Sequence, residues 1–233
     1  MDDDARDGTH QDCADDGGLA VTYYDRDFWS QENLRYTRPH FRLEKAARIV
    51  NKLAVGKQCE LLDIGCGPAT LARFLHENIT YHGIDMAIDQ PAPYLIEADL
   101  VKNPIRFGDK RFDLIVAQGF FEYMGSVQQQ KLAEIADLLA DNGKFLTTYV
   151  NFGHRDREVY WPYNNIHPIG AFRSSLAQYF TVERSFPTSY NWRHSEPGRQ
   201  FMRVSQMPVM ADLPVISRLF GVQYFFICSR CTR

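Results

Sequence analysis

Three carboxylates stand at the carboxyl ends of three predicted β-strands, which indicates a shared binding site. Asp63 lies in a short apolar segment, Asp85 follows the next such segment, and Asp99 follows a third. The carboxyl ends of parallel strands meet at one edge of an open α/β sheet, where ligands bind, so these side chains are expected to converge. An acid after the second strand can accept hydrogen bonds from both hydroxyls of a ribose. The pattern therefore favours a ligand that contains adenosine.

A glycine-rich turn after the first strand narrows the choice of ligand. Gly65 and Gly67 let a ligand approach the backbone closely. The dinucleotide fingerprint needs a third glycine where this chain has Thr70. Asp63 would also repel a pyrophosphate, and Pro68 lacks one of the N–H groups that would bind it. A ligand with an ammonium and a sulfonium suits the same carboxylate, and S-adenosylmethionine has both.

Apolar periodicity predicts the elements that position these residues. Apolar runs indicate strands at residues 60–64, 81–84, 94–98, 112–117, 144–150 and 222–229. Helical spacing indicates a helix around residues 43–50, a second after the glycine turn with Leu71, Phe74 and Leu75 on its apolar face, and a third around 132–139 that ends at Asn142-Gly143. Strands that alternate with helices predict an α/β fold. We expect a Rossmann-like, doubly wound sheet, mostly parallel with a last antiparallel strand.

The chain is expected to divide into an acidic tail and one domain. Residues 1–18 contain seven Asp and one Arg and few apolar side chains, which predicts a mobile tail. Residues 19–233 are expected to fold as a single domain. Within it we assign 19–56 to an N-terminal helical lid, 57–151 to the ligand-binding core, and 152–233 to a substrate-side segment with an insertion and the last strands.

Composition argues against several classes of partner. The formal net charge is −3, and outside the acidic tail the chain is nearly neutral, so no basic stripe is available for nucleic acid. No apolar run approaches the roughly 18 to 20 residues of a membrane span. Five cysteines without a disulfide-like framework, and no signal-like N-terminus, predict a cytoplasmic protein. Cys228 and Cys231 form one C-x-x-C without a second pair, so no metal site is predicted.

From residue 60 to residue 150 the sequence resembles the class I S-adenosylmethionine-dependent methyltransferases of the small-molecule type. Asp63-Ile64-Gly65-Cys66-Gly67 resembles their first motif, which wraps the methionine part of the cofactor. The resemblance implies that Asp85, with Met86 beside it, holds the ribose hydroxyls. It also implies that Asp99 binds the adenine amino group and that Leu100 contacts the ring edge through its backbone.

The second half of the resemblance concerns the side that faces the transferable methyl group. Residues 112–116 resemble the fourth-strand motif, and residues 138–145 resemble the following helix, turn and strand, with Asn142-Gly143 in place of the commoner double glycine. The loop at 118–123 is implied to face the methyl, with Gln118 toward the cofactor and Phe121 and Tyr123 toward the acceptor.

The same resemblance implies a lid and an acceptor of small size. Aromatic residues before the core, Tyr23, Tyr24 and Trp29, are expected to cover the cofactor pocket opposite the aromatic segment 152–192. His154 and His167 are candidate general bases, since neutral imidazole accepts protons near neutral pH, and packing is the alternative role for both. O- or N-methylation of a small molecule such as a natural product is the expected reaction; the oligomeric state is not predicted.

Other functions remain open at this point. A domain that binds S-adenosylmethionine without turnover is disfavoured by the intact cofactor residues. A nicotinamide-dependent oxidoreductase is disfavoured by Thr70 and by the lack of a Tyr-x-x-x-Lys pair. Methylation of adenine in nucleic acid is disfavoured because residues 117–120 lack the Asn/Asp-Pro-Pro-aromatic motif.

Overall fold

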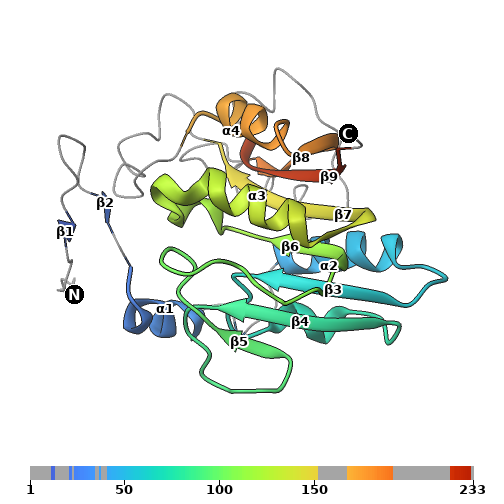
Figure 1. The fold of residues 1–233 in the computed structure, drawn as a ribbon, viewed down its shortest axis with the longest axis horizontal. Helices are drawn as coiled ribbons and strands as arrows, with labels where there is room; N and C mark the ends of the chain where they lie inside the picture. The colour runs from blue at the N-terminus through green and yellow to red at the C-terminus, as the bar shows by residue number, and fades with distance from the viewer. Residues whose placement is uncertain are drawn as a thin grey trace, which may run out of the picture.

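A computed structural model describes residues 12–13, 21–22, 24–34, 37, 41–151, 167–190 and 221–231 of the chain. Among these residues, seven strands form one sheet in the order β5-β4-β3-β6-β7-β9-β8 (Figure 1). The strands are β3 (Cys59–Ile64), β4 (Ile79–Asp85), β5 (Leu95–Glu97), β6 (Phe112–Ala117), β7 (Leu139–Val150), β8 (Phe180–Tyr190) and β9 (Gly221–Arg230). The pairs among β3 to β7 are parallel, and β9 is antiparallel to both neighbours. The expected mostly parallel, Rossmann-like sheet is confirmed.

Helices cover both faces of the sheet (Figure 1). The helix α2 (Phe41–Leu53) packs against one face, and α3 (Gln128–Leu138) and α4 (Ile169–Leu176) pack against the other. Each strand sends alternate side chains to the two faces, so neighbours on β3 enter different cores: Leu61 joins the α2 side and Leu62 the α3 side. This two-sided burial explains the nearly continuous apolar runs in the sequence.

The N-terminal region contains one helix and a short strand pair. The helix α1 (Arg26–Asn33) begins at Asp25, whose side chain accepts a hydrogen bond from Phe28 N and so caps the first turn. Residues 12–13 (β1, Asp12–Cys13) pair antiparallel with β2 (Val21–Thr22). The rest of the predicted tail 1–18 lies outside the described residues.

The element after the glycine turn differs from the prediction. The sequence predicts an α-helix there, whereas the structure has only a five-residue 3₁₀ helix, η2 (Thr70–Phe74). Ala69, directly before it, adopts a left-handed conformation with φ of 53°, and its N–H donates to the Cys66 carbonyl. This tight turn interrupts the helical path, and the predicted apolar face contributes mainly the buried Leu71.

The predicted end of the third helix is also wrong. The helix α3 stops at Leu138, and Leu139 is already extended and pairs with Phe112 as the first residue of β7. Asn142 and Gly143 then fall in an irregular stretch, because the register with β6 shifts before Lys144 pairs with Leu114. A Cβ on Gly143 would lie 2.8 Å from the Leu139 side chain, so the glycine is needed for this bulge rather than for a helix cap.

The antiparallel end of the sheet contains two strands where the sequence predicts one. The strand β9 agrees with the prediction at 222–229, whereas β8 and the helix α4 were not predicted. Three register shifts interrupt the pairing of β8 with β9, so the apolar alternation that would identify β8 in the sequence is irregular.

Two 3₁₀ turns, η3 (Phe121–Tyr123) and η4 (Gly125–Val127), join β6 to α3.

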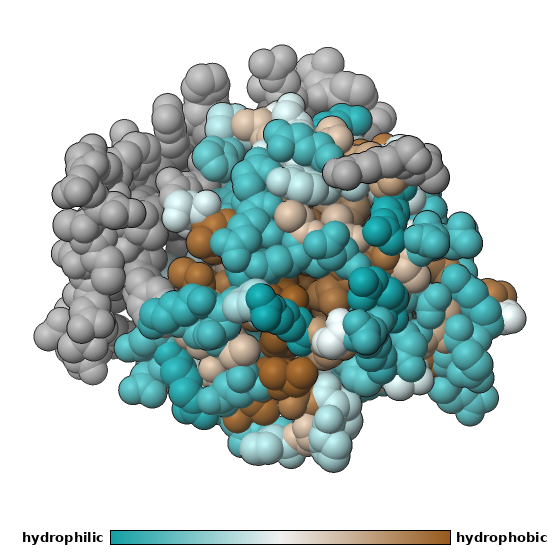
Figure 2. Space-filling model, in the orientation of Figure 1, coloured by the Kyte–Doolittle hydropathy of each residue, from teal (hydrophilic) through white to brown (hydrophobic). Residues whose placement is uncertain are grey.

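The surface contrasts with these cores. Hydrophilic side chains predominate on the face in Figure 2, and hydrophobic ones gather mainly in the lower half of the view. On the edge strand β5, Ile96 is among the exposed large apolar side chains. None of the described helices combines the length and apolar character needed to span a bilayer.

We predict that Phe172→Ala destabilises the fold strongly. Phe172 is fully buried, stacks on Tyr149 with ring centroids 3.8 Å apart, and also contacts Phe121 and Phe226. Removing such a ring from a packed core costs roughly 3 to 5 kcal/mol of unfolding free energy, which urea denaturation measures. The exposed neighbour Arg173→Ala is the control and should change stability by less than about 0.5 kcal/mol. Equal effects of the two variants would contradict the docking of α4 on the sheet.

Candidate functional site

The order of the strands places a ligand site between β3 and β6. The chain runs outward from β3 through β4 to β5, then returns to pair β6 on the other side of β3. In doubly wound sheets, ligands bind at the carboxyl ends of the strands where the order reverses. The segments at this position are the glycine turn after β3 and the loop after β6, which are the two segments expected from the sequence.

The glycine turn uses its own donors to fasten itself to β4. Gly65 N and Cys66 N donate to the Ile84 carbonyl at 2.8 and 3.3 Å, and Gly67 N donates to Asp85 Oδ2 at 2.8 Å. Both glycines have positive φ, 71° and 52°, which side chains rarely tolerate. A pyrophosphate needs free N–H groups at a helix start, and here three are engaged and no α-helix follows. This geometry disfavours a nicotinamide or flavin dinucleotide.

Asp63 is buried just before this turn. Its side chain is 4% exposed, and its Oδ2 accepts a hydrogen bond from the Tyr81 hydroxyl at 2.8 Å. Loss of water raises the pKa of Asp63 from its usual 3.8 to about 7; the Tyr81 hydrogen bond opposes this rise, and the charge of Asp85 adds to it. A buried carboxylate of this kind is stabilised by a cation, so it can receive the ammonium of an amino acid moiety.

Asp85 holds the backbone on both sides of it. Its Oδ2 accepts from Gly67 N, its Oδ1 accepts from Ala87 N at 3.0 Å, and the Asn33 side chain hydrogen-bonds to it as well. Burial raises the pKa of Asp85, while these hydrogen bonds lower it. An ionised carboxylate offers about four lone-pair sites, and the N–H groups of Gly67, Ala87 and Met86 and the Asn33 side chain already donate to this one. A ribose hydroxyl would therefore share these oxygens with the existing donors or displace one of them.

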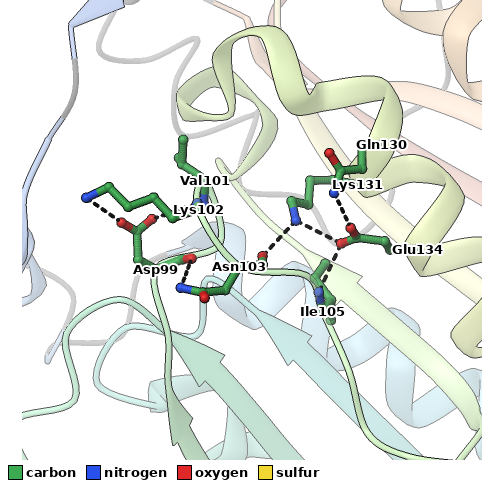
Figure 3. Close-up of polar contacts among 8 residues, drawn as sticks. All are labelled: Asp99, Val101, Lys102, Asn103, Ile105, Gln130, Lys131 and Glu134. Carbon is green, nitrogen blue, oxygen red and sulfur yellow. Dashed lines mark hydrogen bonds and ion pairs between the residues drawn. The ribbon is translucent and has the colours of Figure 1, made fainter. Parts of the chain in front are cut away.

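Asp99 caps the loop that follows β5. Its Oδ1 accepts from Val101 N at 3.0 Å, its Oδ2 pairs with Lys102 Nζ at 3.1 Å, and its carbonyl accepts from the Asn103 side chain (Figure 3). The Leu100 side chain is buried in the core. The structure thus gives Asp99 a local role that the sequence did not indicate, beside the expected contact with adenine.

A buried ion pair fastens the same loop to α3. Lys131 is 1% exposed, and its Nζ donates to the Asn103 carbonyl and to Glu134 Oε2, both at 2.8 Å (Figure 3). Glu134 Oε2 also accepts from Ile105 N at 2.9 Å. Because the lysine is neutralised and hydrogen-bonded, its burial is tolerated, and the position of residues 99–105 becomes fixed relative to the sheet.

The loop after β6 contains a buried hydrogen-bond acceptor without a donor. Gln118 Oε1 is buried without a hydrogen-bond partner, which is costly unless a ligand supplies a donor. Gly119 has φ of 59°, its N–H donates to Thr148 Oγ1, and a Cβ there would meet no atom within 4 Å. Free space and an unpaired acceptor at this strand end indicate room for a ligand.

The side chains of Phe121 and Tyr123 in this loop point in different directions. Phe121 is fully buried in the core against Phe145 and Phe172, so we no longer assign it to the acceptor side. The 3₁₀ turn at 121–123 turns Tyr123 outward, where it contacts Trp29 and Tyr24 of the N-terminal segment. Tyr123 therefore lies against the aromatic side chains of the N-terminal segment.

Glu122 anchors the loop to β7. Its Oε1 accepts from Val150 N at 3.0 Å, while its Oε2 is buried without a hydrogen-bond partner. Burial raises the pKa of Glu122 to about 7, and hydrogen bonds from Val150 and Gln223 and the charge of Arg42 oppose the rise. The Val150 contact explains one oxygen, and the whole carboxyl is a second buried acid, after Asp63, whose pKa lies near neutrality.

The helix α1 lies beside the β4–β5 end of the sheet (Figure 1). Arg26 forms a two-bond ion pair with Glu97, and Ser30 Oγ donates to Asp89 Oδ1 at 2.7 Å. The Trp29 ring meets Tyr123 edge to face, with centroids 4.6 Å apart. The N-terminal segment therefore bridges the two strand-end loops of the site.

Of the remaining predicted site residues, Tyr23 and His154 lie outside the described part of the chain. His167 is exposed before α4, and its backbone N–H donates to the Tyr149 hydroxyl at 2.9 Å. Met86 follows Asp85 in the turn after β4 and is partly buried. The described residues form no cluster of three or more ligating side chains that could hold a metal ion.

Two residues of the site were missed by sequence reasoning. Tyr81 reaches Asp63 because Asp63 pairs with Gly83 across β3 and β4, and Tyr81 is two residues from Gly83 on the same face. The sequence predicts that Tyr81 and Gly83 share one face of a strand, because they lie two residues apart. It does not give the pairing register with β3, which brings Tyr81 near Asp63. Asn33 reaches the site from α1, and nothing in its local sequence indicates this contact.

Comparison with known proteins decides the family. The chain matches the sequence model of a methyltransferase domain over residues 35–183. That match covers more than half of the chain. The chain belongs to this methyltransferase family. No curated protein is significantly similar to it in sequence.

Solved structures of methyltransferases share the fold at low identity. A chain in the complex between the Haloferax volcanii Trm112 methyltransferase activator and a putative methyltransferase is 14% identical, with a TM-score of 0.60 over 90% of this chain and 97% of that one. A SAM-dependent methyltransferase from Archaeoglobus fulgidus is 17% identical, with a TM-score of 0.59 over 88% and 100%. The N-methyltransferase NodS from Bradyrhizobium japonicum, in complex with S-adenosylhomocysteine, is 12% identical, with a TM-score of 0.54 over 88% and 99%.

The protein is thus a class I methyltransferase that uses S-adenosylmethionine as its cofactor. The described residues fit that molecule. The acids beside the glycine turn are buried, and Gln118 Oε1 lacks a donor. These features match a ligand that is cationic at one end and rich in hydrogen-bond donors.

We predict that cofactor binding weakens as the pH falls. Asp63 must be ionised to bind an ammonium, and its pKa of about 7 means that lowering the pH from about 7.5 to about 6 weakens S-adenosylhomocysteine binding roughly tenfold. Isothermal titration calorimetry at several pH values measures this. Asp63→Asn is the matched control and should lose most of this dependence. An identical pH profile in the two proteins would exclude Asp63 as the titrating group.

The same pKa shift predicts an opposite trend for the protein without cofactor. The folded chain binds the Asp63 proton more tightly than the unfolded chain, so this contribution to stability is complete below about pH 4. It is lost as the pH rises through about 7. Thermal melting with and without S-adenosylhomocysteine should therefore show a stabilisation by ligand that grows over this range.

Proposed function

We propose that this methyltransferase transfers the methyl group to an oxygen or nitrogen of a small-molecule acceptor. The observation that carries the proposal is the aromatic contact between α1 and the loop after β6. Tyr24 and Trp29 meet Tyr123 at centroid distances of 5.8 and 4.6 Å, directly beside the strand end expected to face the methyl. Aromatic walls bind a ring or an apolar body by stacking and area burial. A nearly neutral domain lacks the charge that a polyanionic substrate would need.

The proposal gives each cofactor residue a distinct role. Asp63 faces the ammonium, and Asp85, with Met86 beside it, faces the ribose. Asp99 and the backbone of Leu100 face the adenine, held by the ion pair of α3. Gln118, whose Oε1 has no hydrogen-bond partner, and the turn of Gly65, Cys66 and Gly67 complete the cofactor site. When bound, S-adenosylmethionine supplies an electrophilic methyl group on a sulfonium, and the chain's own task is to orient the acceptor and exclude water.

The lid residues would perform that task on the acceptor side. Tyr24, Trp29 and Tyr123 close over the site through α1, which is anchored to the β4–β5 end by Arg26 and Ser30. Closure would keep water from the sulfonium, and opening would release product. Tyr23 is proposed to extend the same wall. His154 and His167 remain proposed proton acceptors for an acceptor atom that carries a proton.

The proposed partners follow from the same features. A small molecule is the proposed substrate, with neither nucleic acid nor membrane as a partner. The N-methyltransferase activity named for NodS supports nitrogen as one acceptor atom. We also propose a cytoplasmic location, which the unpaired, buried thiols of Cys59, Cys66 and Cys228 support.

We predict that Asp85→Asn weakens S-adenosylhomocysteine by roughly 2 to 3 kcal/mol, because the ribose hydroxyls lose a charged acceptor. Asparagine is preferable to alanine because its one oxygen keeps an acceptor for either Gly67 N or Ala87 N, whereas alanine would leave both without one. Calorimetry measures the affinity. Asp113→Asn is the control, since Asp113 makes the same kind of bond to Glu60 N at the opposite end of the sheet. An unchanged affinity in Asp85→Asn would remove Asp85 from the cofactor site.

The acceptor class is tested by an untargeted assay. The protein is incubated with S-adenosylmethionine carrying a labelled methyl group and with a cell metabolite extract, and products are found by mass spectrometry. Labelled small molecules that disappear with Asp63→Asn would support the proposal. Label found only in RNA, DNA or protein would overturn it, and cofactor binding without any labelled product would favour a non-catalytic domain.

A further inference from the structure

The side chain of Asn33 lies against the glycine turn although it belongs to α1. Asn33 is the last residue of that helix and is 5% exposed. Its Nδ2 donates to the Ala87 carbonyl at 3.0 Å, and the side chain also hydrogen-bonds to Asp85. Its Oδ1 is 3.1 Å from the position that a Cβ on Gly67 would occupy. One amide thus touches three points of the strand-end turns.

The orientation of this amide is fixed by its partners. The Ala87 carbonyl is only an acceptor, so the amide nitrogen must face it and the oxygen must face Gly67. The residues that the structure describes donate no hydrogen bond to this oxygen. This oxygen is not among the fully buried atoms that lack a partner, so it is accessible beside the turn and a ligand with a hydroxyl could donate to it.

Anchoring of α1 alone does not explain this arrangement. The helix is already tied to the same region by the Arg26–Glu97 ion pair and by the Ser30–Asp89 hydrogen bond. The Asn33 nitrogen adds a further anchor. Its oxygen, however, makes no contribution to docking, and it lies beside the carboxylate that we assign to the ribose.

We propose that Asn33 is a cofactor-binding residue, whose Oδ1 accepts a hydrogen bond from a ribose hydroxyl that Asp85 also holds. The proposal rests on the assignment of Asp85 to the ribose. Glycine suits position 67 because its φ is 52°, and a Cβ there would also crowd Asn33 Oδ1 at 3.1 Å. It follows that α1 completes the cofactor site as well as covering it.

The test compares Asn33→Leu with the wild-type protein. Leucine has nearly the same shape, so the buried volume is kept while the polar contacts are lost. Calorimetry should show S-adenosylhomocysteine binding weakened about five- to tenfold, and adenosine, which has the ribose but no amino acid part, weakened by a similar factor. Ser30→Ala removes an anchor of α1 that does not touch the turn, and it should change both affinities less than about twofold. Circular dichroism melting confirms that each variant is folded.

Each other outcome overturns the proposal in a distinguishable way. Unchanged affinities in Asn33→Leu would exclude a cofactor contact. A loss for S-adenosylhomocysteine alone would place Asn33 at the amino acid part, and equal losses in Asn33→Leu and Ser30→Ala would reduce it to a helix anchor. If Asn33→Leu does not fold, Asn33→Ser is measured in its place against the same criteria. Failure of the Asp85 assignment itself would appear separately, as an unchanged affinity in Asp85→Asn.

Discussion

Negative charge buried at the ends of two neighbouring strands is the constraint around which this site is built. Asp63 and Asp85 are both buried, and the charge of Asp85 makes the ionisation of Asp63 more costly. The protein offsets this cost with the Tyr81 hydroxyl on one acid and with two backbone N–H groups and the Asn33 amide on the other. A cationic ligand offsets the remainder, which is why a sulfonium and an ammonium suit this edge of the sheet.

The same constraint explains why this glycine turn does not bind phosphates. Its N–H groups serve Ile84 and Asp85, and the left-handed Ala69 prevents an α-helix from starting where a dinucleotide site needs one. Glycine-rich turns after a first strand are shared by several cofactor classes. The decisive difference here lies in where the donors point, which depends on the position of β4 and the carboxylate at its end.

The sequence predicts the parts of this site that depend on local pattern. The apolar strands, the glycine turn and the acids at strand ends repeat with short spacing, so β3, β6 and β9 and the neighbourhood of Asp63 and Asp85 were predictable. Contacts between distant segments were not. Tyr81 needs the β3–β4 register, and Asn33 needs the docking of α1. Asn142-Gly143 is a turn signal that serves a bulge, because the pairing of Leu139 with Phe112 begins the strand early.

The contacts of α1 suggest how cofactor and acceptor binding are linked. Arg26, Ser30 and Asn33 all bind the segment between Asp85 and Glu97, which contains the ribose acid and leads to the adenine loop. A cofactor bound to this segment would therefore favour the docking of α1, and docking places Trp29 against Tyr123 on the proposed acceptor side. By thermodynamic linkage an acceptor held between those rings must tighten the cofactor by the same factor. The contact of Trp29 with Tyr123 already exists in the structure without ligand, so a bound cofactor would strengthen the proposed acceptor wall rather than create it.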